Sequence, residues 1–129
     1  METYSSKKEI YKMETICIMR DLYKAIHAFE TDFESCYGIS LNEALILCSL
    51  NEAQFMMSSK ALAERTEMST SQTSKVIGTT EDKGLIKRIL GQEDKRMMYF
   101  NLTSDGKKIL KRLKTEQLTI PKLIQPIFN

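Results

Sequence analysis

Apolar residues recur every three to five positions between residues 7 and 37, a segment that contains neither glycine nor proline. This spacing predicts a long amphipathic helix whose apolar stripe is wide enough to face two partners. Gly38 is a natural stop after it. A second, strongly apolar helix is predicted over residues 41–50, with Ser40 as its N-cap. The apolar stripe of the first helix consists of Ile10, Met13, Cys17, Leu22, Ile26, Phe29 and Phe33.

Two shorter helices are predicted in the middle of the chain. An extended link over residues 55–57 precedes them and is a candidate first strand of a small sheet. The third helix is expected over residues 60–66, with Ser58 or Ser59 as its cap. After a short turn, Ser69 caps a fourth helix over residues 70–83, which Gly84 ends in the left-handed conformation that suits glycine.

The C-terminal part begins with two β-rich runs, residues 85–90 and 97–102, joined by a polar loop that contains Gly91. They predict a β-hairpin with a loop of moderate length. Thr103 caps a fifth helix over residues 104–114. The final apolar stretch, residues 118–128, is interrupted by two prolines, and Pro121 fits the first turn of a short helix.

Composition narrows the class of protein. At 129 residues the chain is long enough for one domain, residues 1–129, with a hydrophobic core. It lacks a run of about 20 apolar residues and a secretory signal, so we expect a cytoplasmic protein. The three cysteines match no zinc spacing and the single histidine excludes a histidine-rich metal site. No catalytic motif is recognisable, so we expect neither an enzyme nor a cofactor or metal.

Charge is distributed unevenly along the chain. Residues 58–115 hold 13 Lys and Arg against 7 Asp and Glu, a net charge of +6, whereas residues 1–57 hold 5 against 9, a net charge of −4. The basic segment is the one that carries the third and fourth helices and the hairpin. Such an asymmetry favours a face that binds a polyanion.

The start of the fourth helix is rich in hydroxyl and amide side chains. These residues are poor in helix interiors, but they can exchange hydrogen bonds with base edges, and a helix N-terminus favours phosphate. A solvated surface helix is the alternative. The candidate DNA-binding residues here are Ser69, Thr70, Ser71, Gln72, Ser74 and Lys75.

The predicted hairpin loop adds two cations, Lys95 and Arg96. An arginine at such a tip can enter a narrow minor groove, where the negative potential is enhanced. Asp94 is placed to orient the Arg96 guanidinium through a bidentate ion pair. An ordinary charged loop is the alternative reading of this motif taken alone.

Taken in order, these segments resemble the MarR family, the multiple-antibiotic-resistance type of bacterial transcription regulators. The resemblance covers about half the chain, and its joint spacing is specific. It implies a mainly α fold with a small β-hairpin wing, that is, a winged helix-turn-helix. The matching segments are residues 59–64, 68–75, 81–88, 94–96 and 102–106.

The resemblance also implies an assembly and residue roles. Helices within residues 7–37 and 104–129 would form a homodimer, and residues 40–103 the DNA-binding lobe. Ser71, Gln72 and Ser74 would face the major groove, Lys75 would meet phosphate, and Arg96, supported by Asp94, would enter the minor groove. The partner is double-stranded DNA with a pseudo-palindromic operator.

Some positions depart from the family pattern. Thr80 stands where a large aliphatic residue is usual. Gly78 weakens the middle of the fourth helix by about 1 kcal/mol relative to alanine. The region after Gly106 is short and contains two prolines, where family members usually have two longer helices.

Many members of the family bind a lipophilic or phenolic effector. Plain core packing is the alternative for the apolar residues concerned. The candidate pocket residues in this chain are Tyr23, Ile26, His27, Phe33, Leu45 and Cys48. Cys17 lies about where the peroxide-sensing branch has its reactive thiol, so it is the candidate redox residue.

The sequence thus predicts a sequence-specific DNA-binding transcription regulator, a repressor released by a small molecule. Two alternatives stay open at this point. One is a winged-helix protein-interaction module that does not bind DNA, and the other is a cysteine-based redox-sensing regulator.

Overall fold

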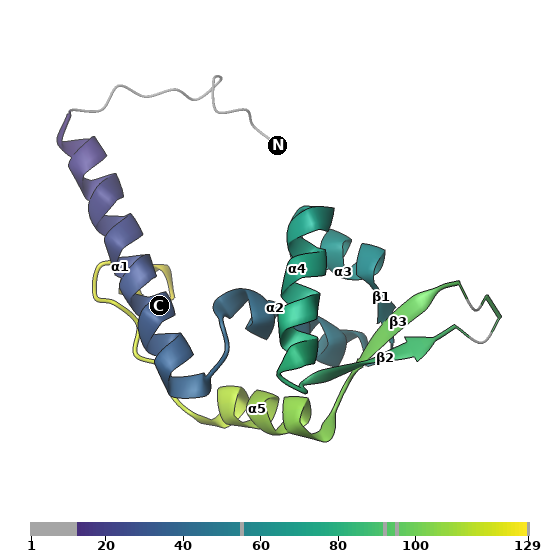
Figure 1. The fold of residues 1–129 in the computed structure, drawn as a ribbon. Coiled ribbons are helices and arrows are strands. Elements are labelled where there is room, and N and C mark those ends of the chain that lie inside the picture. Colours follow the sequence, from purple (N-terminus) through teal and green to yellow (C-terminus); the bar gives the residue numbers. More distant parts are fainter. Residues whose placement is uncertain (1–12, 55, 92, 95, 129) are drawn as a thin grey trace. The chain divides into compact units, whose positions relative to one another are not determined.

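The computed structural model describes residues 13–54, 56–91, 93–94 and 96–128 (Figure 1). It divides into two compact units: the described parts of residues 1–31 and 119–129, and residues 32–118. The second unit includes more residues than the predicted DNA-binding lobe, which covers residues 40–103. The elements are α1 (Glu14–Tyr37), α2 (Leu41–Ala53), β1 (Met57–Ser58), α3 (Ser59–Thr66), α4 (Thr70–Asp82), β2 (Ile86–Leu90), β3 (Met98–Leu102), α5 (Ser104–Thr115) and a 3₁₀ turn, η1 (Gln125–Ile127).

Hydroxyl side chains set the starts of four helices. Ser40, Ser58, Ser69 and Thr103 each have extended backbone and accept a hydrogen bond from the backbone N–H three residues later. Each bond satisfies one of the orphan donors in the first turn. The predicted caps of α2, α4 and α5 are therefore confirmed, and Ser58 rather than Ser59 caps α3.

A small antiparallel sheet joins the two sides of the helix-turn-helix. Its strand order is β1-β3-β2. Phe100 of the central strand β3 lies opposite Met57 of β1 on one side and opposite Arg88 of β2 on the other. The hairpin of β2 and β3 extends away from the helices in Figure 1. The expected hairpin is confirmed, and the first strand begins at Met57, at the end of the predicted link. Phe55 lies outside the described residues.

The core of the second unit lies between α2, α3, α4 and the sheet. Ile39, Ile46, Leu47 and Leu62 are fully buried, and Phe100 packs among the same elements. Thr80 of α4 is also fully buried, and its hydroxyl donates to the Val76 carbonyl at 2.6 Å. A threonine can therefore replace an aliphatic residue here because its polar atom is satisfied within the helix.

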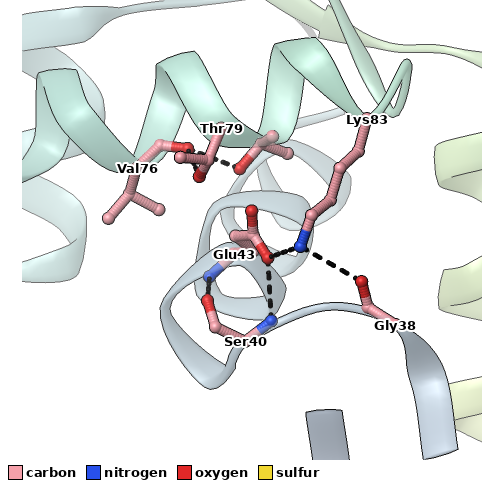
Figure 2. A network of polar contacts seen from close by, with 7 residues as sticks. Gly38, Ser40, Glu43, Val76, Thr79 and Lys83 are labelled. Atoms are coloured by element: carbon pink, nitrogen blue, oxygen red, sulfur yellow. Dashed lines mark hydrogen bonds and ion pairs between the residues drawn. The ribbon is translucent and has the colours of Figure 1, made fainter. Parts of the chain in front are cut away.

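A buried carboxylate ties together three segments of this unit (Figure 2). Glu43 is 3% exposed, and its Oε1 accepts from the Ser40 N–H at 2.8 Å and from Lys83 Nζ at 2.7 Å. Lys83 Nζ also donates to the Gly38 carbonyl at 3.1 Å. The start of α2, the end of α1 and the end of α4 are thereby fixed to one another.

The environment of Glu43 lowers the pKa of its carboxyl below the ordinary value. Burial alone would raise that pKa, but hydrogen bonds from Lys83, the Ser40 N–H and Thr79 favour the charged form and prevail. A carboxyl whose pKa is lowered by folding stabilises the fold above its ordinary pKa. This stabilisation is lost as the pH falls through the folded-state pKa.

The ends of the described chain differ in part from the predictions. The first helix was expected from residue 7. Residues 7–12 lie outside the described part of the chain, and within that part α1 begins at Glu14. Pro121 was expected in the first turn of a short helix. Its carbonyl instead closes a single turn by accepting from Ile124 and Gln125, and the 3₁₀ turn that follows contains Pro126. In a longer helix from Pro121, Pro126 would lie in the interior, where it lacks the N–H to bond the carbonyl four residues earlier and its ring would clash with that carbonyl. None of the described helices is long and apolar enough to cross a bilayer.

We expect Glu43→Gln to reduce the free energy of unfolding by about 1–3 kcal/mol at pH 7, because Lys83 and Ser40 lose a charged acceptor. The difference from the parent should shrink as the pH falls below the ordinary pKa of a glutamate and through the lowered folded-state pKa of Glu43, where its carboxylate becomes protonated. Urea unfolding of both proteins at pH 7 and pH 3.5 measures it. Glu52→Gln, which removes an exposed ion pair with Arg65, is the matched control and should cost less than about 1 kcal/mol. A Glu43→Gln deficit of equal size at both pH values would contradict the role given to the carboxylate.

Candidate nucleic-acid interface

The exposed side of α4 is made of the polar residues predicted to bind DNA. Ser71, Ser74 and Lys75 are exposed, as are Ser69, Thr70 and Gln72 at the start of the helix. The opposite side is buried, and consists of Thr73, Val76, Ile77 and Thr80. Positions three and four apart share one side of a helix, so the core-facing residues determine which polar residues face out.

Local hydrogen bonds hold the start of α4 in place. The Ser69 hydroxyl accepts from the Gln72 N–H at 3.1 Å, and the Ser69 carbonyl accepts from the Thr73 hydroxyl at 2.8 Å. The preceding turn passes through Glu67, whose φ is 61°. In the preceding helix, α3, the residues Leu62 and Ala63 are buried. The first turn of α4 is therefore positioned before any partner arrives.

Lys75 is exposed and has no ion-pair partner in the part of the chain that the structure describes. It differs in this from Lys83 and Arg65, which are paired with Glu43 and Glu52. An ammonium on an exposed helix face that lacks a protein carboxylate is available to an external anion. Phosphate is the anion that a lysine binds as a point charge.

An open hollow of about 530 Å³ borders this face of α4. It adds two residues that the sequence did not single out: Asn42 from α2 and Thr79 from the third turn of α4. Thr79 could have been found, because it follows Gln72 by seven residues and Lys75 by four. Asn42 could not, because its position depends on how α2 packs against α4. The hollow is lined by Asn42, Ser69, Ser71, Gln72, Lys75, Val76 and Thr79.

The loop of the β-hairpin is closed by backbone hydrogen bonds. The Gly91 N–H donates to the Met97 carbonyl at 2.9 Å, and the Met97 N–H donates to the Asp94 carbonyl at 3.0 Å. A Cβ on Gly91 would lie 2.5 Å from the Asp94 carbonyl oxygen. Glycine is therefore required for the chain to turn this tightly.

Asp94 and Arg96 form the bidentate pair that the sequence predicts. Arg96 Nε lies 3.1 Å from Asp94 Oδ1 and its Nη2 lies 3.2 Å from Oδ2, while the Arg96 N–H also donates to Oδ1. These bonds lower the pKa of the Asp94 carboxyl. The Arg96 side chain is nevertheless 92% exposed, so its guanidinium is oriented and still open to a partner. Lys95 lies outside the described residues.

The hairpin is braced against α4 by contacts between their roots. Arg88 of β2 donates to both Glu81 carboxylate oxygens, at 2.8 and 3.1 Å, and its guanidinium lies 5.6 Å from the Phe100 ring centre. The Leu85 N–H donates to the Thr80 carbonyl at 3.3 Å. These contacts hold the start of the hairpin against the end of α4, which sets the direction of the hairpin relative to the helix.

The candidate pocket residues are divided between the two units. Phe33, Leu45 and Cys48 line one apolar cavity of about 360 Å³, together with Leu41, Ala44, Leu113 and Leu118. Burial raises the pKa of the Cys48 thiol. The other three candidates, Tyr23, Ile26 and His27, belong to the first unit and are exposed there. The full six-residue pocket stays a prediction.

Cys17, the candidate redox residue, is an exposed free thiol on α1. The described residues contain no group of three or more His, Cys, Asp or Glu side chains that could hold a metal ion. The redox role stays a prediction as well.

Comparison with known proteins finds similar sequences and similar folds. A sequence model of the MarR family matches residues 37–97, the span from the end of α1 to the hairpin loop. A curated relative, the uncharacterized HTH-type transcriptional regulator YwaE of Bacillus subtilis (strain 168), is 28% identical over 112 residues, which cover 84% of this chain. The match spans 65% of that relative, slightly less than two thirds of its length.

Solved structures share the fold. A MepR-like protein complexed with pseudoligands superimposes with a TM-score of 0.75 and 18% identity, covering 92% of this chain and 82% of its own. A mutant of S. aureus MepR bound to an oligodeoxyribonucleotide gives a TM-score of 0.62 at 17% identity, covering 81% of this chain and 76% of its own. With helices of the predicted order, a three-stranded sheet bearing the wing, and a family-model match over residues 37–97, the chain is similar to the MarR family in fold and in this part of its sequence.

Proposed function

We propose that this protein is a sequence-specific, double-stranded-DNA-binding transcription regulator that acts as a repressor in the cytoplasm. The observation that carries the proposal is the pairing of two braced elements. One is the polar face of α4 with Lys75, which has no ion-pair partner among the described residues, and the other is the loop that presents Arg96. A MepR mutant of similar fold was solved with bound oligodeoxyribonucleotide, which supports DNA as the partner.

The two elements would divide the work of recognition. Ser71, Gln72 and Ser74 carry the donors and acceptors that read base edges in the major groove. Lys75 would bind a phosphate and fix the register. Arg96, held by Asp94, would enter the minor groove, where the pattern of donors and acceptors is degenerate and the potential depends on groove width.

We propose that two copies of the chain bind a pseudo-palindromic operator. The first unit exposes large apolar side chains: Met13 is 80% exposed, Ile16 67% and Ile127 76%. Large apolar side chains that stay exposed in this way support an interaction surface on this unit. A second copy of the chain is the partner that matches a two-fold symmetric operator.

We further propose that a small lipophilic effector releases the DNA. The cavity that Phe33, Leu45 and Cys48 line is almost wholly apolar and lies between α2 and the end of α5. Its volume of about 360 Å³ is within the range of small-molecule sites. An effector there would press on α2, which the Glu43 network connects to α4.

Binding to double-stranded DNA should depend strongly on salt. If a dimer neutralises roughly 6–10 phosphates, its affinity should fall on the order of 10³-fold or more between 50 and 200 mM salt. Fluorescence anisotropy with labelled DNA, selected by the protein from a random pool, measures this directly. The absence of enrichment from the pool, or an affinity that does not change with salt, would reject the proposed function.

Arg96→Ala should weaken binding to selected and scrambled DNA alike, because the wing contact is mainly insensitive to sequence. Gln72→Ala should cost about 1–3 kcal/mol on the selected DNA and little on the scrambled sequence. Asp94→Ala should give a milder form of the Arg96→Ala defect. Anisotropy at one salt concentration compares the variants, with Lys111→Ala on the exposed side of α5 as the control for loss of one charge. If Arg96→Ala binds both DNAs as tightly as the parent, the wing does not contact DNA.

Static light scattering at micromolar concentration should return twice the mass of the chain. Ile16→Glu places a charge in the exposed apolar face of α1 and should shift the protein toward monomer. Asp21→Asn alters an exposed residue of the same helix and should leave the dimer intact. A parent protein that is monomeric under these conditions would overturn the proposed assembly.

A further inference from the structure

Gly78 lies in the interior of α4, the ninth of its 13 residues. Glycine is among the least favourable residues in a helix interior, because its backbone loses the most conformational freedom on folding. A glycine in the middle of the helix that carries the candidate interface therefore calls for a physical reason.

The described part of the protein supplies such a reason for the other four of the five glycines. Gly38 and Gly84 have φ of 73° and 74°, the left-handed region that favours glycine. Cβ atoms on Gly91 and Gly106 would collide with the carbonyl oxygens of Asp94 and Leu85. Gly78 is different: it has no positive φ, and a Cβ built on it would meet nothing within 4 Å. Alanine would fit this fold at position 78 without strain.

Gly78 lies on the face of α4 that points away from the core. It follows Ser71 by seven residues, Ser74 by four and Lys75 by three, spacings that place all four on one side of a helix. The residues beside it, Ile77 and Thr80, belong to the buried side. The empty space beside Gly78 is thus on the surface that we propose binds DNA.

We propose that Gly78 lets the sugar–phosphate backbone of bound DNA approach α4 more closely than any side chain at this position would allow. This inference rests on the proposed function and adds a residue to its interface. Gly78 is about 10 Å further along the helix than Ser71. Residues near the start of a recognition helix contact base edges in the major groove. A residue two turns further along the helix, such as Gly78, is therefore placed beside the sugar–phosphate backbone that borders the groove. Lys75, one turn earlier, attracts the same backbone.

If the DNA backbone lies this close to Gly78, a substitution with alanine should stabilise the fold and weaken DNA binding. Gly78→Ala should raise the Tm by about 2–5 °C, because alanine is the better helix former. The same variant should raise the Kd for DNA about tenfold, which corresponds to about 1.4 kcal/mol. Since the contact is to the backbone, selected and scrambled DNA should be weakened by a similar factor. Gly78→Leu, with a larger side chain, should weaken both further.

The test uses the full chain, thermal unfolding, light scattering and anisotropy with DNA selected from a random pool and its scrambled counterpart. Ser35→Ala, which improves helix propensity at an exposed position of α1, is the matched control and should leave the Kd unchanged. A parent that binds DNA and a Gly78→Ala variant that binds equally well would overturn the inference while leaving the proposed function intact. A change in oligomeric state in place of the change in DNA affinity would also overturn it, because a second copy would then occupy the space. A parent that fails to bind DNA would reject the proposed function itself.

Discussion

The ion pair between Glu43 and Lys83 is the contact that holds α4, the helix proposed to bind DNA, in position. Glu43 is buried at the start of α2, and Lys83 immediately follows α4. An unpaired carboxylate at this depth would be strongly unfavourable, so burial of Glu43 requires the end of α4 to stay where it is. The Gly38 carbonyl, bound by the same ammonium, adds the end of α1 to the junction (Figure 2).

From this junction the chain fixes the rest of the interface in steps. The end of α4 leads through Gly84 into β2, and Thr103, which caps α5, donates its hydroxyl to the Gly84 carbonyl at 2.7 Å. Gly106 lets α5 pack directly on the Leu85 carbonyl. Glu81 and Arg88 then link the helix to the hairpin that carries the wing loop. Each link is short and local, so the angle between α4 and the wing is set by the fold rather than by the partner.

Hydroxyl side chains serve two purposes in this lobe, and the direction in which they point decides which. Thr73 and Thr80 face the core and donate to backbone carbonyls one turn earlier, so their burial leaves no unsatisfied polar atom. Ser71 and Ser74 face outward on the same helix. One run of small polar residues thus holds the helix together on one side and leaves donors and acceptors for a partner on the other.

The features that the sequence predicts well are those encoded within a few residues. The caps at Ser40, Ser69 and Thr103, the left-handed Gly84 and the Asp94–Arg96 pair all arise from neighbours in the chain, and all are observed. Contacts between distant residues escaped prediction. Glu43 and Lys83 are 40 residues apart, and the position of Asn42 beside α4 follows only from the packing of α2. Many charged residues could pair in principle, and packing alone selects which do.

Hydroxyl-radical footprinting of the selected DNA, with the parent protein and with Arg96→Ala, tests the central claim that α4 and the wing together form the DNA-binding surface. For the parent, the account predicts two protected half-sites, spaced by one helical turn or a multiple of it, with further protection in the flanking minor groove. For Arg96→Ala it predicts that the half-sites remain and the flanking protection is lost. Identical footprints for the two proteins, or no protected half-sites with the parent, would contradict it.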